Sequence, residues 1–444
     1  MTDLIAARLQ MGLSLAFHII FAVVGIGMPV LMVIAEALWL RTGDAIYRDL
    51  AKRWARGTAI LFAVGAVSGT VLAFELGLLW PHFMHFAGPI FGVSFSLEGF
   101  AFFLEAIFLG IYLYGWDRVP PRAHLFAGVV IALAGTASGV FVSTANAWMN
   151  TPAGFRLVDG RATDISPLSA MLNPASGTEC VHVALSAFVT LGFLVSAVHA
   201  YRLLRAPGSG FHRRALKIAL PLATVSAVLQ PISGDFSAQH VAEQQPVKLA
   251  AMEGQWETER GAPLRAGGWV FEDEEVTRYA IEIPYGLSLL SFHDPMAEIH
   301  GLREVPRADR PPAALVHLAF QLMVGCGLFM AGVGLLGALL AWRRRRHWPQ
   351  RWYLKLVIAA GPVGVVALQA GWMVTELGRQ PWIVRGVMRT ADAVTPMPHL
   401  IGPLIATVVL YTGLALIVFV LLTRVIFRES VAAESAEEGS DDGA

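Results

Sequence analysis

The sequence predicts an all-α, polytopic membrane protein with about nine transmembrane helices. Apolar residues make up 55% of the 444-residue chain and charged residues only 15%, whereas soluble domains are much richer in charge. The mean hydropathy of +0.58 points the same way. Nine segments hold, or nearly hold, the roughly 20 mostly apolar residues that a helix needs to cross the hydrocarbon core of a bilayer.

The nine apolar segments follow one another along the whole chain. The sixth is the weakest because Pro221 and Pro231 interrupt it, although prolines are tolerated where neighbouring groups bond the freed backbone. The charge pattern of the connections requires this helix. In order, the segments cover 12–40, 58–79, 93–115, 124–148, 180–203, 216–235, 312–342, 354–376 and 398–427.

Basic residues in the connections give the helices a direction. The odd-numbered connections contain eighteen Lys and Arg, against five in the short connections of the other side. Because basic loops remain in the cytoplasm, we expect the N-terminus in the periplasm and the C-terminus in the cytoplasm. Several tryptophans lie at expected helix ends, as an interfacial aromatic belt requires: Trp80, Trp116, Trp148 and Trp342.

Four parts are expected along the chain. Residues 1–235 contain helices one to six, residues 236–311 form a polar periplasmic loop, residues 312–428 contain helices seven to nine, and residues 429–444 form a disordered acidic cytoplasmic tail. A loop as long as 236–311 is more often functional than idle. No internal repeat is visible, which argues against transporter folds built from two related halves.

Charge balance and cysteine content exclude several classes of protein. The 33 basic residues equal the 33 acidic residues, so no nucleic-acid partner is indicated, and the lipid bilayer is the expected partner. The two cysteines, Cys180 and Cys326, have no motif spacing. A disulfide scaffold and a cysteine-ligated zinc or iron–sulfur site are therefore excluded, and any metal must have other ligands.

Ionisable residues inside the expected spans are candidates for function, because an unpaired charge there costs several kcal/mol. Glu98 and Glu105 are seven residues apart and share one helix face. Imidazole and thioether groups bind haem iron, and helix bundles hold such cofactors in their cores. By their positions, the candidates belong to the outer half of the bilayer: His18, Glu75, Glu98, Glu105, His182, Met323 and Glu376.

Each of these residues also has a purely structural interpretation. A lone histidine can be a hydrogen-bonded core residue, and a methionine among 14 is usually a packing residue. We expect Glu36 at the membrane interface, His124 at a helix end, and His82 and His85 in a solvated loop over 79–92. These residues alone indicate only a polar site in the outer half of the membrane.

Sequence motifs add a family resemblance that covers nearly the whole chain. GWMVTELGRQPW, Gly371 to Trp382, resembles the GRQPW signature of subunit I of the cytochrome bd-type ubiquinol oxidases. Only the acidic tail and much of 260–312 lie outside the resemblance. Its other segments are ARLQMGLSLAFH (7–18), SLEGFAFFLEA (96–106), NAWMNTPAGF (146–155), VHVALSAFVT (181–190), GDFSAQHVAEQQPVKLAAMEGQWET (234–258) and FQLMVGCG (320–327).

The resemblance implies two haem b groups and one haem d, with haem b replacing haem d in some members. His182 and Met323 would be the axial ligands of the low-spin haem b. Glu376 would bind the high-spin haem b, and His18 the haem that reduces oxygen. Oxygen needs an open iron position, so this last haem must be five-coordinate. The chain has no CxxCH motif, so the haems would be bound non-covalently.

The resemblance also implies roles for polar residues around the haems. The loop 236–311 would bind quinol at Lys248 and Glu253, where a carboxylate can accept a quinol proton. Glu98 and Glu105 would deliver protons from the inner side to the oxygen site. In the signature, Arg379 would bind haem propionates, unless it is an ordinary interfacial residue. Gln380 and Trp382 complete the cofactor-binding set.

The chain departs from the family pattern in two ways. Many members have an arginine two residues before the axial methionine, where this chain has Gln321. Loss of that cation is expected to shift a haem potential or a quinol affinity. The loop also lacks the C-terminal insertion of longer-loop members, which indicates the cyanide-insensitive branch, where the haem d signal can be weak or missing.

The expected function is that of the catalytic subunit of a quinol:oxygen oxidoreductase in the bacterial inner membrane. It would oxidise ubiquinol or menaquinol outside and reduce O2 with cytoplasmic protons, so generating a proton-motive force. A second large membrane subunit and a small single-span subunit are the implied partners. Two alternatives remain: a proton-coupled secondary transporter, and a non-catalytic haem-b anchor that needs His182 and Met323 but neither Glu376 nor His18.

Overall fold

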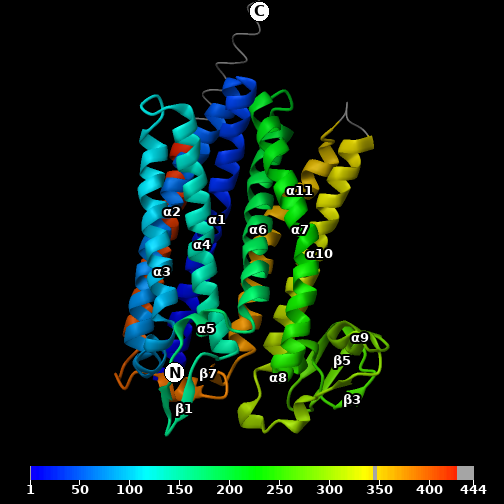
Figure 1. Ribbon diagram of the computed structural model, residues 1–444. Coiled ribbons are helices and arrows are strands. Elements are labelled where there is room, and N and C mark those ends of the chain that lie inside the picture. The colour runs from blue at the N-terminus through cyan, green and yellow to red at the C-terminus, as the bar shows by residue number, and fades with distance from the viewer. Residues whose placement is uncertain (1, 344–347, 428–444) are drawn as a thin grey trace, which may run out of the picture.

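The computed structural model describes residues 2–343 and 348–427, and helices dominate it (Figure 1). Within these ranges, nine helices are long and apolar enough to cross a membrane, which confirms the expected fold class. The acidic tail, 429–444, lies outside the described residues. The nine are α1 (Asp3–Thr42), α2 (Ala45–Leu79), α3 (Pro81–Tyr114), α4 (Pro121–Asn150), α6 (Ser176–Arg205), α7 (Gly210–Gln244), α10 (Ala313–Arg343), α11 (Arg351–Leu377) and α13 (Ile401–Leu421), which runs on into a π-helical turn, Leu422–Phe427.

Several helices are longer than the hydropathy pattern predicts. Helix α1 begins at Asp3 and not near 12, α2 begins at Ala45 and not near 58, and α3 and α7 are also extended. The expected loop 79–92 is wrong: α3 begins at Pro81, since proline is favoured in the first turn of a helix. His82 and His85 are exposed on its first turns. The sixth span, α7, continues through Pro221 and Pro231 to Gln244, well beyond the expected end at 235.

The membrane helices form two groups of four. Helices α1 to α4 pack together on one side, and α6, α7, α10 and α11 on the other, as Figure 1 shows. The groups meet where α6 packs against α1 and α4. Gln369 of α11 also donates a hydrogen bond to the carbonyl of Ala16 in α1, at 2.7 Å. Helix α13 packs along α1 and α2.

Glycines let helices of the second group approach closely. A Cβ atom on Gly192 of α6 would lie 2.7 Å from the Cβ of Ala223 in α7, and one on Gly364 of α11 would lie 2.9 Å from the Cα of Thr190 in α6. Small residues at such crossings are typical of membrane bundles, where association depends on van der Waals contact. These crossings fix the positions of α6, α7 and α11 relative to one another.

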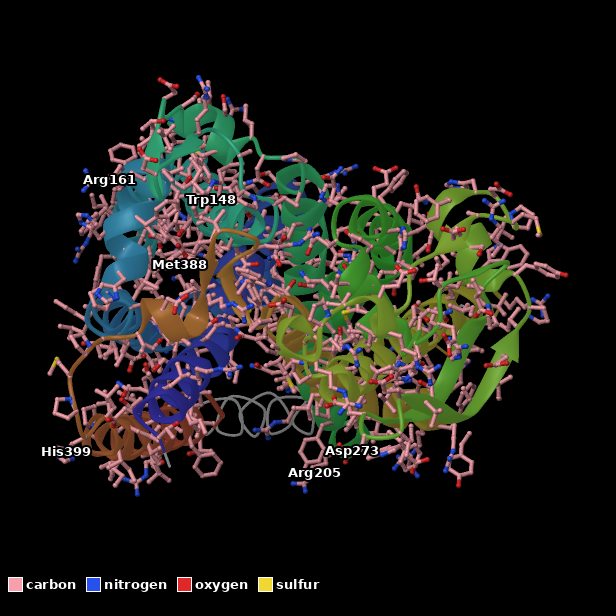
Figure 2. All side chains as sticks on the ribbon, turned by 90° about the horizontal axis from the view of Figure 1, so that it is seen from below. Trp148, Arg161, Arg205, Asp273, Met388 and His399 are labelled. Atoms are coloured by element: carbon pink, nitrogen blue, oxygen red, sulfur yellow. The ribbon has the colours of Figure 1, made fainter. Side chains whose placement is uncertain are left out.

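The short elements gather at the end of the bundle where α1 begins, which we call the loop end (Figure 1). Seen from this end, residues 246–312 cover one side and residues 382–400, which include Met388 and His399, the other (Figure 2). Between α7 and α10 lie α8 (Pro246–Glu253), β3 (Glu259–Arg260) paired with β6 (Glu298–Ile299), β4 (Leu264–Phe271) paired antiparallel with β5 (Val276–Ile283), and α9 (Gly286–Phe292). Two 3-10 helices, η1 (Leu302–Glu304) and η2 (Arg307–Asp309), precede α10. The other short elements are β1 (Arg156–Val158), β2 (Arg161–Thr163), α5 (Pro167–Met171), β7 (Trp382–Val384), β8 (Met388–Arg389) and α12 (Thr390–Ala393).

Candidate functional site

His18 lies in α1 with its ring against α2. Its Nδ1 is 3.0 Å from the hydroxyl of Ser68, which donates to the carbonyl of Gly65. A Cβ atom on Gly69 would lie only 2.9 Å from His18 Cε1. A polar group that fixes one ring nitrogen is the arrangement found behind metal-ligating histidines. His18 is therefore oriented as an iron ligand would be.

His182 is the seventh residue of α6, and one turn of α7 holds its ring. The hydroxyl of Ser233 is 2.9 Å from Nδ1, and the amide nitrogen of Gln230 is 3.0 Å from Nε2. Because that amide group is a donor, Nε2 accepts and Nδ1 bears the proton. A metal would use this Nε2 lone pair, so iron would take the place of the Gln230 amide as its partner. Gly234 completes the turn, since its Cβ would lie 3.4 Å from His182 Cε1.

Met323 is the eleventh residue of α10, and its sulfur faces α11. A Cβ atom on Gly371 would lie 3.1 Å from Met323 Sδ. Met323 and His182 are both half-buried, lie nearer the loop end, and belong to the same group of four helices. Glycines beside His18, His182 and Met323 let each side chain lie against the backbone of the neighbouring helix. Imidazole and thioether are also the side-chain groups that bind haem iron, so these residues fit a haem.

No group of three or more His, Cys, Asp or Glu side chains in the described ranges could hold a metal ion alone. A haem would need only one or two protein ligands, because the porphyrin supplies the other four. The candidate ligands accordingly come singly from α1, α6, α10 and α11.

Glu376 is the last residue but one of α11 and belongs to a chain of hydrogen bonds. Its Oε1 accepts from the amide of Asn146, and its Oε2 accepts from Arg379 Nη2 at 2.6 Å. The Asn150 amide donates to Asn146 Oδ1 at 3.2 Å, and Lys248 Nζ donates to Asn150 Oδ1 at 2.5 Å. The expected quinol residue Lys248 and the expected iron ligand Glu376 thus belong to one network.

Arg379 is the one cation of the signature, and only 4% of its surface is exposed. Its Nε and Nη1 atoms have no hydrogen-bond partner among the described residues. Buried guanidinium donors suit a carboxylate such as a haem propionate. The other signature residues bond within the loop 378–400, since Gln380 accepts from Thr390 at 3.0 Å and Trp382 lies beneath the guanidinium of Arg389.

Lys248 and Glu253 are both buried on α8 but have different surroundings. Lys248 faces Asn150 of α4, whereas Glu253 is influenced by the guanidinium of Arg265 in β4. Burial raises the pKa of Glu253 to about 8, although Arg265 opposes the shift. Burial lowers the pKa of Lys248, against the attraction of Glu179. The side chains of Lys248 and Glu253 therefore belong to different polar clusters.

Gln321, which occupies the position of the expected arginine, holds the β4 strand against α10. Its Oε1 accepts from the Gly267 amide at 3.0 Å, and its Nε2 donates to the Arg265 carbonyl at 2.9 Å. One turn earlier, His317 Nδ1 lies 2.8 Å from the carbonyl oxygen of Met252, and His317 Nε2 lies 3.1 Å from that of Gly267. Through Gln321, helix α10 therefore positions Arg265, the cation near Glu253. The same helix carries Met323, a candidate iron ligand.

Glu98 and Glu105 both face α4. Glu98 lies against Ser138, and Glu105 Oε1 would be 3.1 Å from a Cβ atom on Gly135. Glu105 is 4% exposed, and its Oε1 has no partner in the described part of the chain. Because α3 begins at Pro81, Glu105 lies beyond the middle of the helix. Along α3, which ends at Tyr114, Glu105 therefore lies farther from the loop end than Glu98.

Several buried polar residues gave little signal in the sequence. Glu36, expected at the interface, is fully buried and lies 2.8 Å from His124 Nδ1. Glu179, Asn150 and Arg265 belong to polar clusters whose members come from distant parts of the chain. Their function depends on partners that spacing along the sequence does not reveal.

Comparison with known proteins agrees with this geometry. A solved structure, bd oxidase from Geobacillus thermodenitrificans, superposes with a TM-score of 0.91 at 39% identity, over 96% of this chain and 99% of that one. A Bacillus subtilis protein provisionally named as subunit I of a cytochrome bd menaquinol oxidase is 37% identical, over 89% of this chain and 90% of its own length. Subunit 1 of the cytochrome bd-II ubiquinol oxidase of Escherichia coli is 30% identical, over 97% and 98%.

The family model described as cytochrome bd terminal oxidase subunit I matches residues 6–430, nearly the whole chain. The resemblance first drawn from the polar motifs is therefore confirmed, and the chain belongs to the family of subunit I of the cytochrome bd terminal oxidases.

Proposed function

We propose that this chain is the haem-binding catalytic subunit of a quinol:oxygen oxidoreductase, with quinol oxidised at the loop end and O2 reduced to water among the helices. The main support is the pair His182 and Met323, since each lies beside a glycine of a facing helix and the histidine ring is held by hydrogen bonds. The chain is a multi-pass protein of the bacterial inner membrane.

The cofactors are haems, as the cytochrome family implies. We assign two haem b groups and one haem d, which a third haem b can replace. When bound, haem supplies one-electron transfer and an iron atom that can bind oxygen. His182 and Met323 would hold the low-spin haem, while Glu376 and His18 would each ligate one high-spin haem. Arg379 would bind a propionate through the donors that lack protein partners.

Glu253 is the proposed proton acceptor for quinol. Its Oε2 is buried and has no hydrogen-bond partner among the described residues, so it can accept from a quinol hydroxyl. Arg265 provides a nearby cation that favours the ionised carboxylate. The related oxidases are named for ubiquinol or menaquinol, and either ring presents the same hydroxyl group to Glu253.

We place the loop end in the periplasm on the basis of the basic connections at the opposite end. Protons from quinol then leave outside, and Glu98 and Glu105 on α3 transfer cytoplasmic protons towards the oxygen site. This separation would generate a proton-motive force. We propose four parts along the chain, with the expected boundary at 235 moved to Gln244, where α7 ends. They are helices one to six (1–244), the quinol loop (245–311), helices seven to nine (312–428) and the acidic tail (429–444).

A subunit I implies a subunit II. We further propose a small single-span subunit. Exposed apolar side chains on α3 and α13 suit contacts with lipid or with another membrane helix. They include Phe100, Phe103, Ile107, Val409 and Phe419.

A pyridine haemochrome assay with reduced-minus-oxidised spectra on the purified complex would count and identify the haems. A transporter would be colourless, whereas we expect a Soret band that dithionite shifts. Replacing both Glu376 and His18 by Ala should abolish quinol-driven oxygen uptake. If uptake survives this double replacement, the anchor interpretation is favoured and the proposed oxygen site is wrong.

A further inference from the structure

We infer that Lys248 acts on Glu376 through Asn150 and Asn146, as a positioning residue of the iron-ligand site. This inference rests on the proposed function, in which Glu376 ligates the high-spin haem. It assigns a role to two asparagines of α4, and it moves Lys248 away from direct contact with quinol.

The bonds run without interruption from α8 to α11. Lys248 Nζ donates to Asn150 Oδ1 at 2.5 Å, and the Asn150 amide donates to Asn146 Oδ1 at 3.2 Å. The Asn146 amide donates to Glu376 Oε1. Asn146 and Asn150 are four residues apart on α4, so they lie one above the other on the same face. Three segments distant in the sequence are thereby joined at the loop end.

The Lys248 side chain is also fixed along its length. A Cβ atom on Gly378 would lie 2.9 Å from Lys248 Cγ and 3.1 Å from Cε, so the lysine stem lies against the backbone that follows α11. Lys248 is 6% exposed and Asn150 is 1% exposed. Buried polar groups are costly unless they are hydrogen-bonded, so this arrangement is strongly preferred over alternatives.

The charges around Lys248 belong to the same site. Glu179, Arg379, Glu376 and Arg385 act electrostatically on Lys248. Glu253 lies on the other side of α8: five residues along a helix turn the side chain by roughly 140°, and its charged neighbour is Arg265. The lysine therefore serves the Glu376 cluster, while the quinol carboxylate lies elsewhere.

Hydrogen bonds to a ligating group tune the metal that it binds. The lysine cation and the two amides draw negative charge from the Glu376 carboxylate and make it a weaker donor. Without them, the carboxylate should favour ferric iron, so the midpoint potential of the high-spin haem should fall.

The test is redox titration of the haems in the purified complex, carrying Lys248→Met, Asn150→Ala, or both. We expect each single change to alter the redox equilibrium constant of the high-spin haem about tenfold, about 59 mV for one electron. The double change should shift the potential little further than either single change, because both single changes remove the same connection. Asn173→Ala is the matched control, since Asn173 is similarly buried at the loop end but bonds to Thr144, Ala170 and Thr151.

An unchanged high-spin potential in Lys248→Met and Asn150→Ala, with a raised quinol KM in Lys248→Met alone, would overturn the inference. The same holds if Asn173→Ala causes an equal shift, because the effect would then be general. The haem content of the purified Glu376→Ala complex distinguishes a failure of the proposed iron ligand from a failure of the inference alone. If it keeps every haem, the proposed ligand is wrong and the inference fails with it; if one haem is lost while potentials in the other variants stay constant, only the inference fails.

Discussion

Gly371 of α11 faces the sulfur of Met323 on α10 so closely that a Cβ atom there would lie 3.1 Å from Met323 Sδ. This distance is shorter than ordinary van der Waals contact, so any larger residue must displace the methionine. Gly69 has the same relationship to His18, at 2.9 Å from Cε1, whereas the 3.4 Å between a Cβ atom on Gly234 and His182 Cε1 is ordinary contact. Glycine at these positions keeps the three side chains free to adopt the geometry that an iron ligand needs.

Gly371→Ala should therefore weaken the bond between Met323 and iron while the fold is kept. The added methyl group pushes the sulfur by a few tenths of an ångström, so a fraction of the low-spin haem should become high-spin. Reduced-minus-oxidised spectra of the purified complex measure that fraction. Gly325→Ala on α10 is the control, because a Cβ atom there meets nothing within 4 Å. Equal spectra for both variants would contradict the assignment.

Met323→Leu should remove the thioether with little effect on folding, since the exchange conserves volume and costs at most about 1.5 kcal/mol. The low-spin haem should become high-spin, and its midpoint potential should fall, because a thioether ligand raises the potential. Redox titration followed by visible spectroscopy is the measurement. A spectrum identical to that of the parent complex would remove Met323 from the ligands.

Quinol oxidation should depend on pH through Glu253. Burial raises the pKa of this carboxyl to about 8, and only its ionised form can accept a quinol proton. The rate should rise about tenfold per pH unit below that value and level off above it. Initial rates of oxygen uptake from pH 6 upward measure this dependence.

Glu253→Gln should lower the rate and abolish its pH dependence, because an amide cannot accept the proton. All haem spectra should stay unchanged, since Glu253 lies away from the Glu376 cluster. A pH profile in Glu253→Gln that matches the parent would assign the titration to another group.

The sequence predicted the membrane helices well because apolar length determines membrane insertion directly. It missed the start of α3 at Pro81, where two histidines and Pro89 made the first turns resemble a loop. It also indicated Lys248 as a quinol residue and Glu376 as an iron ligand, each on its own. It gave no sign that Asn150 and Asn146 connect them, because these contacts form between helices far apart in the chain.

Gln321 illustrates the same limit, since the sequence showed only that an arginine was missing. In the folded chain, its amide bonds the backbone of Arg265 and Gly267 and so holds β4 on α10. This arrangement keeps a cation near Glu253 without a charge at position 321. In this chain an uncharged side chain at position 321 therefore attaches β4 to the bundle.

Gln321→Ala should loosen β4 and weaken quinol binding. Two hydrogen bonds are lost, each worth about 1 kcal/mol, so Arg265 should move away from Glu253 and the KM for quinol should rise several-fold. Hydrogen exchange over 264–271 should accelerate, while the haem spectra should change little because Met323 keeps its contact with Gly371. Gln239→Ala is the control, since Gln239 bonds to Asp235 within α7. If exchange in β4 stays as slow as in Gln239→Ala, Gln321 does not hold the strand, and the attachment must depend on His317, whose ring lies within 3.1 Å of the Gly267 carbonyl.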